Sequence, residues 1–65
     1  MTLKVNGEPR PFAGKTLGEL LRSLNLTAGR LACEVNAEIV RRADYDGTVL
    51  KDGDEVEIVQ MIGGG

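Results

Sequence analysis

A single leucine-rich segment predicts one short amphipathic helix, and this limits the architectures open to a chain of 65 residues. Thr16 and Glu19 match a capping box, with Thr16 as the N-cap and Glu19 at the third helical position. The leucines that follow the cap recur at the spacing of one apolar helix face: Leu17, Leu20, Leu21 and Leu24. A dimerising coiled coil would need several such repeats. We therefore expect the helix to pack on a sheet formed by the same chain and to cover one of its faces.

The first twelve residues predict a β-hairpin at the edge of that sheet. Apolar and polar residues alternate over residues 1–5, and the Asn6-Gly7 pair that follows is a strong signal for a two-residue turn. The returning segment, residues 8–12, contains Pro9 and Pro11. In a two-residue hairpin both prolines fall at positions that form no hydrogen bond with the partner strand. They would also block the addition of a further strand, which places this segment at the edge.

Short strands and turns fill the second half of the chain. Alternation over residues 31–35 predicts a strand with Cys33 on its apolar face, and the Asn36-Ala37 pair turns the chain into residues 38–41. Asp and Gly residues predict turns over residues 44–47 and 51–54. Both segments have the composition of calcium loops but lack the spaced ligands of the twelve-residue calcium pattern, so we interpret them as turns.

The last strand carries apolar residues on both faces. Val56 and Ile58 share one parity, and we assign them to the face under the helix. Val59 and Met61 share the other parity, so they would lie on the uncovered face or on the departing tail. Exposed apolar side chains there would suit a docking surface for a partner.

The predicted order, a hairpin, one helix and then several short strands, favours an α+β fold of the β-grasp type. We expect a mixed sheet of four to five strands, with the last strand beside the first and the one main helix packed on one face. Residues 1–60 would form this domain, and residues 61–65 would form a flexible tail that ends in glycines.

Composition excludes several functions. A formal net charge of −2 with scattered basic residues argues against nucleic acid as a partner. The chain has no histidine and one cysteine, so it lacks an imidazole base, a plausible zinc set and an internal disulfide. Cys33 fits a small buried apolar residue better than a nucleophile. No segment has the pattern of a membrane span or a signal peptide, so we expect a cytoplasmic protein. Because the chain carries no self-sufficient active site, we expect that it is not itself an enzyme.

Three consecutive glycines, Gly63, Gly64 and Gly65, follow Ile62 at the end of the sequence. Glycines cost backbone entropy to order and pack no side chain, so fold stability does not call for them there. A side-chain-free end can thread a narrow channel and present its carboxylate to a partner enzyme. A frayed tail is the alternative explanation.

Taken in order, these segments resemble the ThiS family of thiamine-biosynthesis sulfur carriers. The resemblance covers essentially the whole chain and rests on the order of its motifs, which include the segment Glu34-Val35-Asn36, the turn Asp52-Gly53-Asp54 and the terminal Gly64-Gly65 pair. It implies a ubiquitin-like β-grasp fold. Gly63 stands where that family often has another small residue.

The resemblance also implies a function centred on Gly65. An E1-like adenylyltransferase would use ATP and Mg²⁺ to convert the Gly65 carboxylate to an acyl-adenylate, and this chain itself would bind no cofactor. A sulfur donor such as a cysteine desulfurase would then generate a thiocarboxylate, and thiazole synthase would receive the sulfur. The residues expected to contact these partners are Val59, Met61, Ile62, Gly63 and Gly64.

Two other functions stay open from the sequence. The small subunit of molybdopterin synthase shares the fold and the Gly-Gly end but usually runs longer. A ubiquitin-like interaction module or modifier would use the same surface with an inert or conjugated tail.

Overall fold

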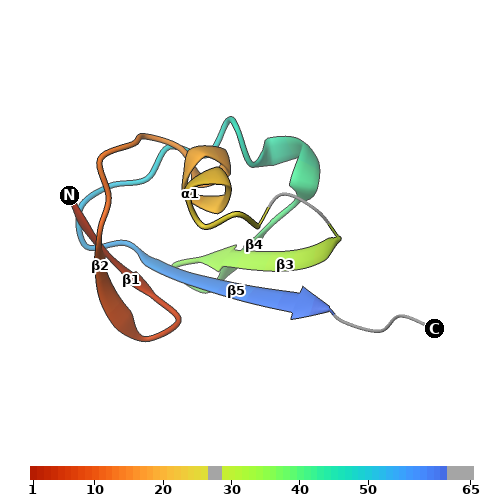
Figure 1. Ribbon diagram of the computed structural model, residues 1–65, viewed down its shortest axis with the longest axis horizontal. Helices are drawn as coiled ribbons and strands as arrows, with labels where there is room; N and C mark the ends of the chain where they lie inside the picture. Colours follow the sequence, from red (N-terminus) through yellow and green to blue (C-terminus); the bar gives the residue numbers. More distant parts are fainter. Residues whose placement is uncertain (27–28, 62–65) are drawn as a thin grey trace.

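The computed structural model describes residues 1–26 and 29–61, and one α-helix crosses one sheet in them (Figure 1). The elements follow the order expected from the sequence. Their bounds are β1 (Thr2–Val5), β2 (Glu8–Pro11), α1 (Leu17–Ser23), β3 (Arg30–Val35), β4 (Glu38–Val40), the 3₁₀ turn η1 (Arg42–Asp44) and β5 (Glu55–Met61).

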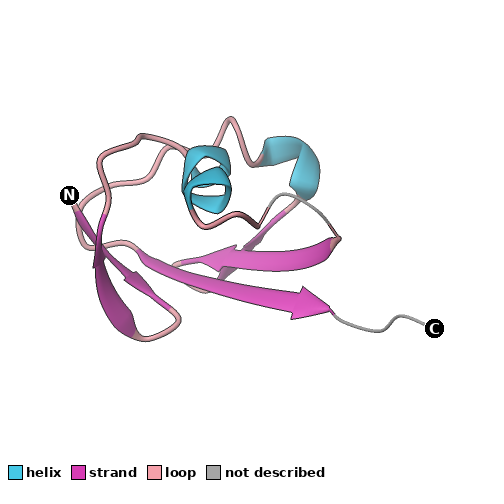
Figure 2. Cartoon of the chain, in the orientation of Figure 1, coloured by secondary structure: helices cyan, strands magenta, loops and turns pink. Residues whose placement is uncertain are grey.

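The five strands form one mixed sheet in the order β2-β1-β5-β3-β4. The central pair, β1 and β5, is parallel, and the other neighbours are antiparallel. Both α1 and η1 lie on one side of this sheet (Figure 2). The β-grasp arrangement, with the last strand beside the first, is therefore confirmed.

The N-terminal hairpin has the register that its prolines require. Pro9 pairs with Lys4 and Pro11 with Thr2, while Phe12 donates its backbone N–H to the Met1 carbonyl at 2.8 Å. The hydrogen-bonded pairs thus alternate with the proline positions, so no ladder bond is lost. Strand β2 lies at the edge of the sheet, as predicted.

The core lies between the leucine face of α1 and the sheet. Leu17 and Leu20 of the helix are fully buried, and Leu21 is 3% exposed. Leu24 ends the helix as its C-cap and is half-buried. The buried apolar residues outside the helix are Leu3, Cys33, Leu50, Val56 and Ile58. Burial of one such side chain contributes about 1.5–3 kcal/mol. The predicted burial of Cys33 and the inward assignment of Val56 and Ile58 are confirmed.

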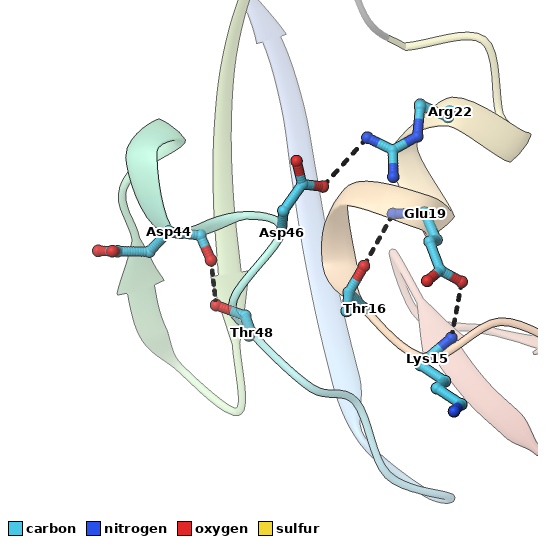
Figure 3. Close-up of polar contacts among 7 residues, drawn as sticks. All are labelled: Lys15, Thr16, Glu19, Arg22, Asp44, Asp46 and Thr48. Carbon is cyan, nitrogen blue, oxygen red and sulfur yellow. Dashed lines mark hydrogen bonds and ion pairs between the residues drawn. The ribbon is translucent and has the colours of Figure 1, made fainter.

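At the start of α1, the expected hydrogen bond between the N-cap side chain of Thr16 and the Glu19 amide is present. Glu19 donates its backbone N–H to the Thr16 hydroxyl at 3.2 Å, which satisfies one of the free amides of the first turn (Figure 3). The Glu19 carboxylate accepts from the Lys15 amide at 3.0 Å, one residue before the N-cap. A long-range contact holds the same segment, because the backbone at Thr16 forms a bridge with Val49 and the Lys15 carbonyl accepts from the Leu50 amide.

Two hairpin turns use left-handed backbone. Asn6 and Gly7 have φ of 50° and 84°, and Asn36 and Ala37 have φ of 51° and 69°. Asparagine and glycine tolerate this region, whereas alanine is strained in it. Ala37 is exposed, so no packing of its side chain offsets that strain.

Asp54 is the one polar residue buried among those that the structure describes, with 9% exposure. Its carboxylate accepts from the Asn36 side chain at 3.0 Å and from the Lys51 amide at 2.8 Å. The hydrogen bond from Asn36, assisted by the Lys51 amide and charge, lowers the pKa of Asp54 despite the opposing effect of burial. The carboxylate therefore joins the turn before β5 to the turn between β3 and β4.

Replacing Ala37 with glycine should stabilise the fold. Glycine adopts positive φ without the Cβ clash, and the gain exceeds the extra entropy of the unfolded chain, so Ala37→Gly should raise the free energy of unfolding by about 1 kcal/mol. Urea denaturation measures this change. The control is Ala43→Gly in η1, outside the positive-φ positions, which should lower stability. A loss of stability in both variants would contradict the strain at Ala37.

The second prediction concerns acid. Because the pKa of Asp54 is lower in the folded protein than its unfolded value of about 3.9, the ionised carboxylate stabilises the fold above that value. This contribution is lost as the pH falls through the folded-state pKa. We expect the free energy of unfolding to fall between about pH 5 and pH 2, and to fall less steeply in Asp54→Asn. Asp44→Asn changes an exposed carboxylate and serves as the control. If the free energy of unfolding falls with pH equally steeply in wild type and Asp54→Asn, the stabilising role of the ionised Asp54 carboxylate is refuted.

Candidate functional site

Strand β5 carries the two predicted docking residues that the structure describes. Val59 and Met61 are 57% and 54% exposed, while Val56 and Ile58 point the other way into the core. This alternation places Val59 and Met61 on the face of the sheet opposite α1, which we call the open face. Their predicted position on the uncovered face is therefore confirmed, and Met61 lies within β5.

The other predicted site residues are Ile62, Gly63, Gly64 and Gly65, and they lie outside the described residues. They follow directly on Met61 in the sequence. Their expected role therefore stays a prediction.

The neighbours of Val59 and Met61 on β3 set the chemistry of the open face. Val59 pairs with Ala32, and Met61 pairs with Arg30. One row further along, Glu34 and Glu57 are direct cross-strand neighbours, so two carboxylates face one another there. Like charges in this position destabilise a sheet slightly. The open face thus joins a small apolar patch to a region of negative charge.

Ile39 is a further open-face residue that sequence reasoning did not single out. It pairs with Glu34 on β3, next to the pair of buried Cys33 with half-buried Val40, and it is 77% exposed. The alternation of residues 38–40 would have assigned Ile39 to the outer face once Val40 was assigned to the core. The strand is only three residues long, however, and so short a pattern defines a face poorly.

Asn6 is a second residue whose role sequence reasoning missed. Its side chain accepts from the Ile58 amide at 2.8 Å and donates to the Ile58 carbonyl at 3.2 Å. It therefore occupies both backbone groups of one β5 residue, as a paired strand residue would do. The sequence marked Asn6 only as a turn former, since its partner lies 52 positions away.

The thiol of the chain lies away from the open face. Cys33 is buried in the core, and burial raises the pKa of Tyr45, which packs against that core. No group of three potential metal-binding side chains occurs among the described residues. No helix within residues 1–26 and 29–61 is long and apolar enough to cross a membrane.

Comparison with known proteins gives consistent matches along the chain. A family model described as the ThiS family matches residues 3–65. The sulfur carrier protein ThiS of Thermus thermophilus is 39% identical over 61 residues, which cover 94% of this chain and 95% of that protein. The thiazole synthase of Paramagnetospirillum magneticum is 44% identical over 66 residues, which cover all of this chain and 20% of that protein. The chain thus spans about a fifth of the length of the thiazole synthase.

A solved structure agrees with the sequence matches. The crystal structure of the thiamine biosynthesis protein (ThiS) from Geobacter metallireducens superposes with a TM-score of 0.83 at 38% identity, over the full length of both chains. The family model covers nearly the whole sequence, and the Thermus thermophilus protein is matched along almost its full length. By these matches and by its fold, the chain belongs to the ThiS family.

Proposed function

We propose that this chain is a sulfur carrier in thiamine biosynthesis and that the carboxylate of Gly65 carries the sulfur. The observation that carries the proposal is the match to the ThiS family over residues 3–65, which includes the terminal glycines. Relatives named as sulfur carriers are 39% and 36% identical to this chain.

The proposed chemistry begins with activation of a poor electrophile. An E1-like adenylyltransferase joins the Gly65 carboxylate to the AMP part of ATP, with Mg²⁺ on the phosphates, and releases pyrophosphate. A persulfide sulfur, supplied through a donor such as a cysteine desulfurase, then attacks the acyl carbon and displaces AMP, which leaves an acyl disulfide. A thiol reduces this disulfide, so that the thiocarboxylate is released and the donor sulfur ends in a new disulfide with the thiol. The net change is the replacement of one carboxylate oxygen by sulfur.

Thiazole synthase is the proposed recipient of the sulfur. The relatives from Paramagnetospirillum magneticum and Magnetococcus marinus are named thiazole synthase, and a region similar to this chain makes up 20% of each. When a carrier-like region and its enzyme belong to the same polypeptide, the carrier is present at a high local concentration near the enzyme. This covalent link supports thiazole synthase as a partner of the separate carrier.

The open face is the proposed docking surface for these partners. Val59 and Met61 are exposed on it, directly before the segment that ends at Gly65. Burial of such apolar side chains on binding would contribute affinity, while the carboxylates of Glu34 and Glu57 would favour a basic partner surface. The proposal thus separates docking, by the open face, from reaction, at Gly65.

Intact-protein mass spectrometry tests the sulfur transfer. The protein is purified from cells that contain its partner enzymes, and we expect a fraction in which one oxygen is replaced by sulfur. Proteolysis should place this change on the C-terminal peptide that contains Gly65. A variant that lacks Gly65 should carry no sulfur and should fail to restore growth without thiamine. Sulfur on Cys33, or normal growth without Gly65, would overturn the assignment.

Substitution on the open face tests docking. Val59→Gln removes an exposed apolar side chain without adding charge, and we expect the KM of the adenylating enzyme for the carrier to rise about tenfold, equivalent to about 1.4 kcal/mol. The matched control is Val49→Gln. Val49 is 65% exposed but forms a bridge with Thr16 at the helix and lies outside the sheet strands. If the two variants raise KM equally, the open face is not the docking surface.

A further inference from the structure

Strand β5 is held unequally along its two sides. On one side it pairs with β3 over its whole described length, from Val35↔Val56 to Arg30↔Met61. On the other side, pairing with β1 ends at Val5↔Val56. The second half of β5 therefore has a strand neighbour on one side, while a groove of ≈ 620 Å³ lies on the other, where Ile58 and Gln60 contribute to its lining.

The Asn6 side chain extends the contact on this second side by one residue pair. The Asn6 backbone amide donates to the Val56 carbonyl at 2.9 Å, and its side chain then takes up the amide and carbonyl of Ile58. Both side-chain bonds are partly buried, which strengthens them relative to bonds in water. Asn6 thus replaces the next residue of β1, which has turned away into the hairpin.

Asn36 provides an internal comparison at the opposite end of β5. It too is the first residue of a two-residue turn, with φ of 51° against 50° for Asn6. Its side chain accepts from the Glu55 amide at 3.0 Å and donates to the Asp54 carboxylate at 3.0 Å. Each asparagine therefore makes two side-chain bonds at β5 or the turn before it, but Asn36 acts at the beginning of the strand and Asn6 in its second half.

We propose that Asn6 is a positioning residue, which holds the second half of β5 in line so that the segment after Met61 starts from a fixed place and direction. This inference rests on the proposed function of Gly65. Four residues separate Met61 from the reacting carboxylate. A looser strand end widens the range of positions that the reacting group can take, and small errors of placement cost large factors in rate.

The kinetic effect is predicted to fall on turnover. Val59 and Met61 pair with β3 and not with Asn6, so we expect the docking surface to be kept when the Asn6 bonds are lost. The test compares Asn6→Gly with Asn36→Gly, since glycine keeps the positive φ of either turn and removes the side-chain bonds. The measurement is AMP release by the adenylating enzyme with ATP and a sulfur donor at varied carrier concentration, at a temperature where both variants are folded by circular dichroism.

We expect Asn6→Gly to lower kcat about tenfold with KM changed less than twofold, and Asn36→Gly to change both less than twofold. Asn6→Asp keeps an acceptor for the Ile58 amide but loses the donor, so its kcat should fall between those of wild type and Asn6→Gly. Equal kinetics in the two glycine variants, or an effect of Asn6→Gly on KM alone, would overturn the proposal.

A second measurement needs no enzyme. ¹⁵N relaxation of the Gln60 and Met61 amides should show increased motion in Asn6→Gly and wild-type values in Asn36→Gly. Unchanged relaxation in Asn6→Gly would refute the positioning role even if kcat falls. Wild-type carrier that the enzyme leaves unmodified would instead refute the proposed function, and the relaxation data would still decide whether Asn6 fixes the end of β5.

Discussion

The pairing of β5 between β1 and β3 is the interaction on which the rest of this small fold depends. It joins the first strand to the last one in parallel and so closes the chain on itself. It also places Val56 and Ile58 beneath the leucine face of α1, where both are buried. A parallel pair cannot be joined by a tight turn, so a long connection must link β1 to β5, and here it contains β2, the helix and the second hairpin.

A single described helix above a five-stranded sheet makes the two faces of the sheet different. The covered face contains the core, and the open face has no helix of the described residues over it (Figure 1). The apolar side chains of Val59, Met61 and Ile39 are therefore exposed although they belong to strands. In a chain of this size the asymmetry separates two tasks. One face stabilises the fold, and the other is available for a partner, as the proposed carrier function in the ThiS family requires.

Polar side chains take over part of the backbone hydrogen bonding around β5. Asn6 and Asn36 each satisfy a β5 amide, and the Asp54 carboxylate holds the Lys51 amide in the preceding turn. A short chain has few residues with which to lengthen its strands, and an amide side chain can replace a strand residue at the point where the chain must turn. Such bonds are directional, and those of Asn6 and Asp54 are also partly buried, so they define the position of β5 more sharply than apolar contacts alone.

Local chemistry in the sequence determined the elements and most of their faces. The Asn6-Gly7 pair and the two prolines defined the first hairpin and its register, the Thr16 cap and the leucine spacing defined α1, and alternation assigned Val56 and Val59 to opposite faces of β5. Only the tertiary structure decided the contacts between residues far apart in the chain. A backbone bridge joins Thr16 to Val49, the outer position of Ile39 follows from its pairing with β3, and the contact of Asn6 with Ile58 spans 52 positions. Periodicity and turn signals depend only on residues a few positions apart and predict local structure. The long-range contacts form only once the strands have paired.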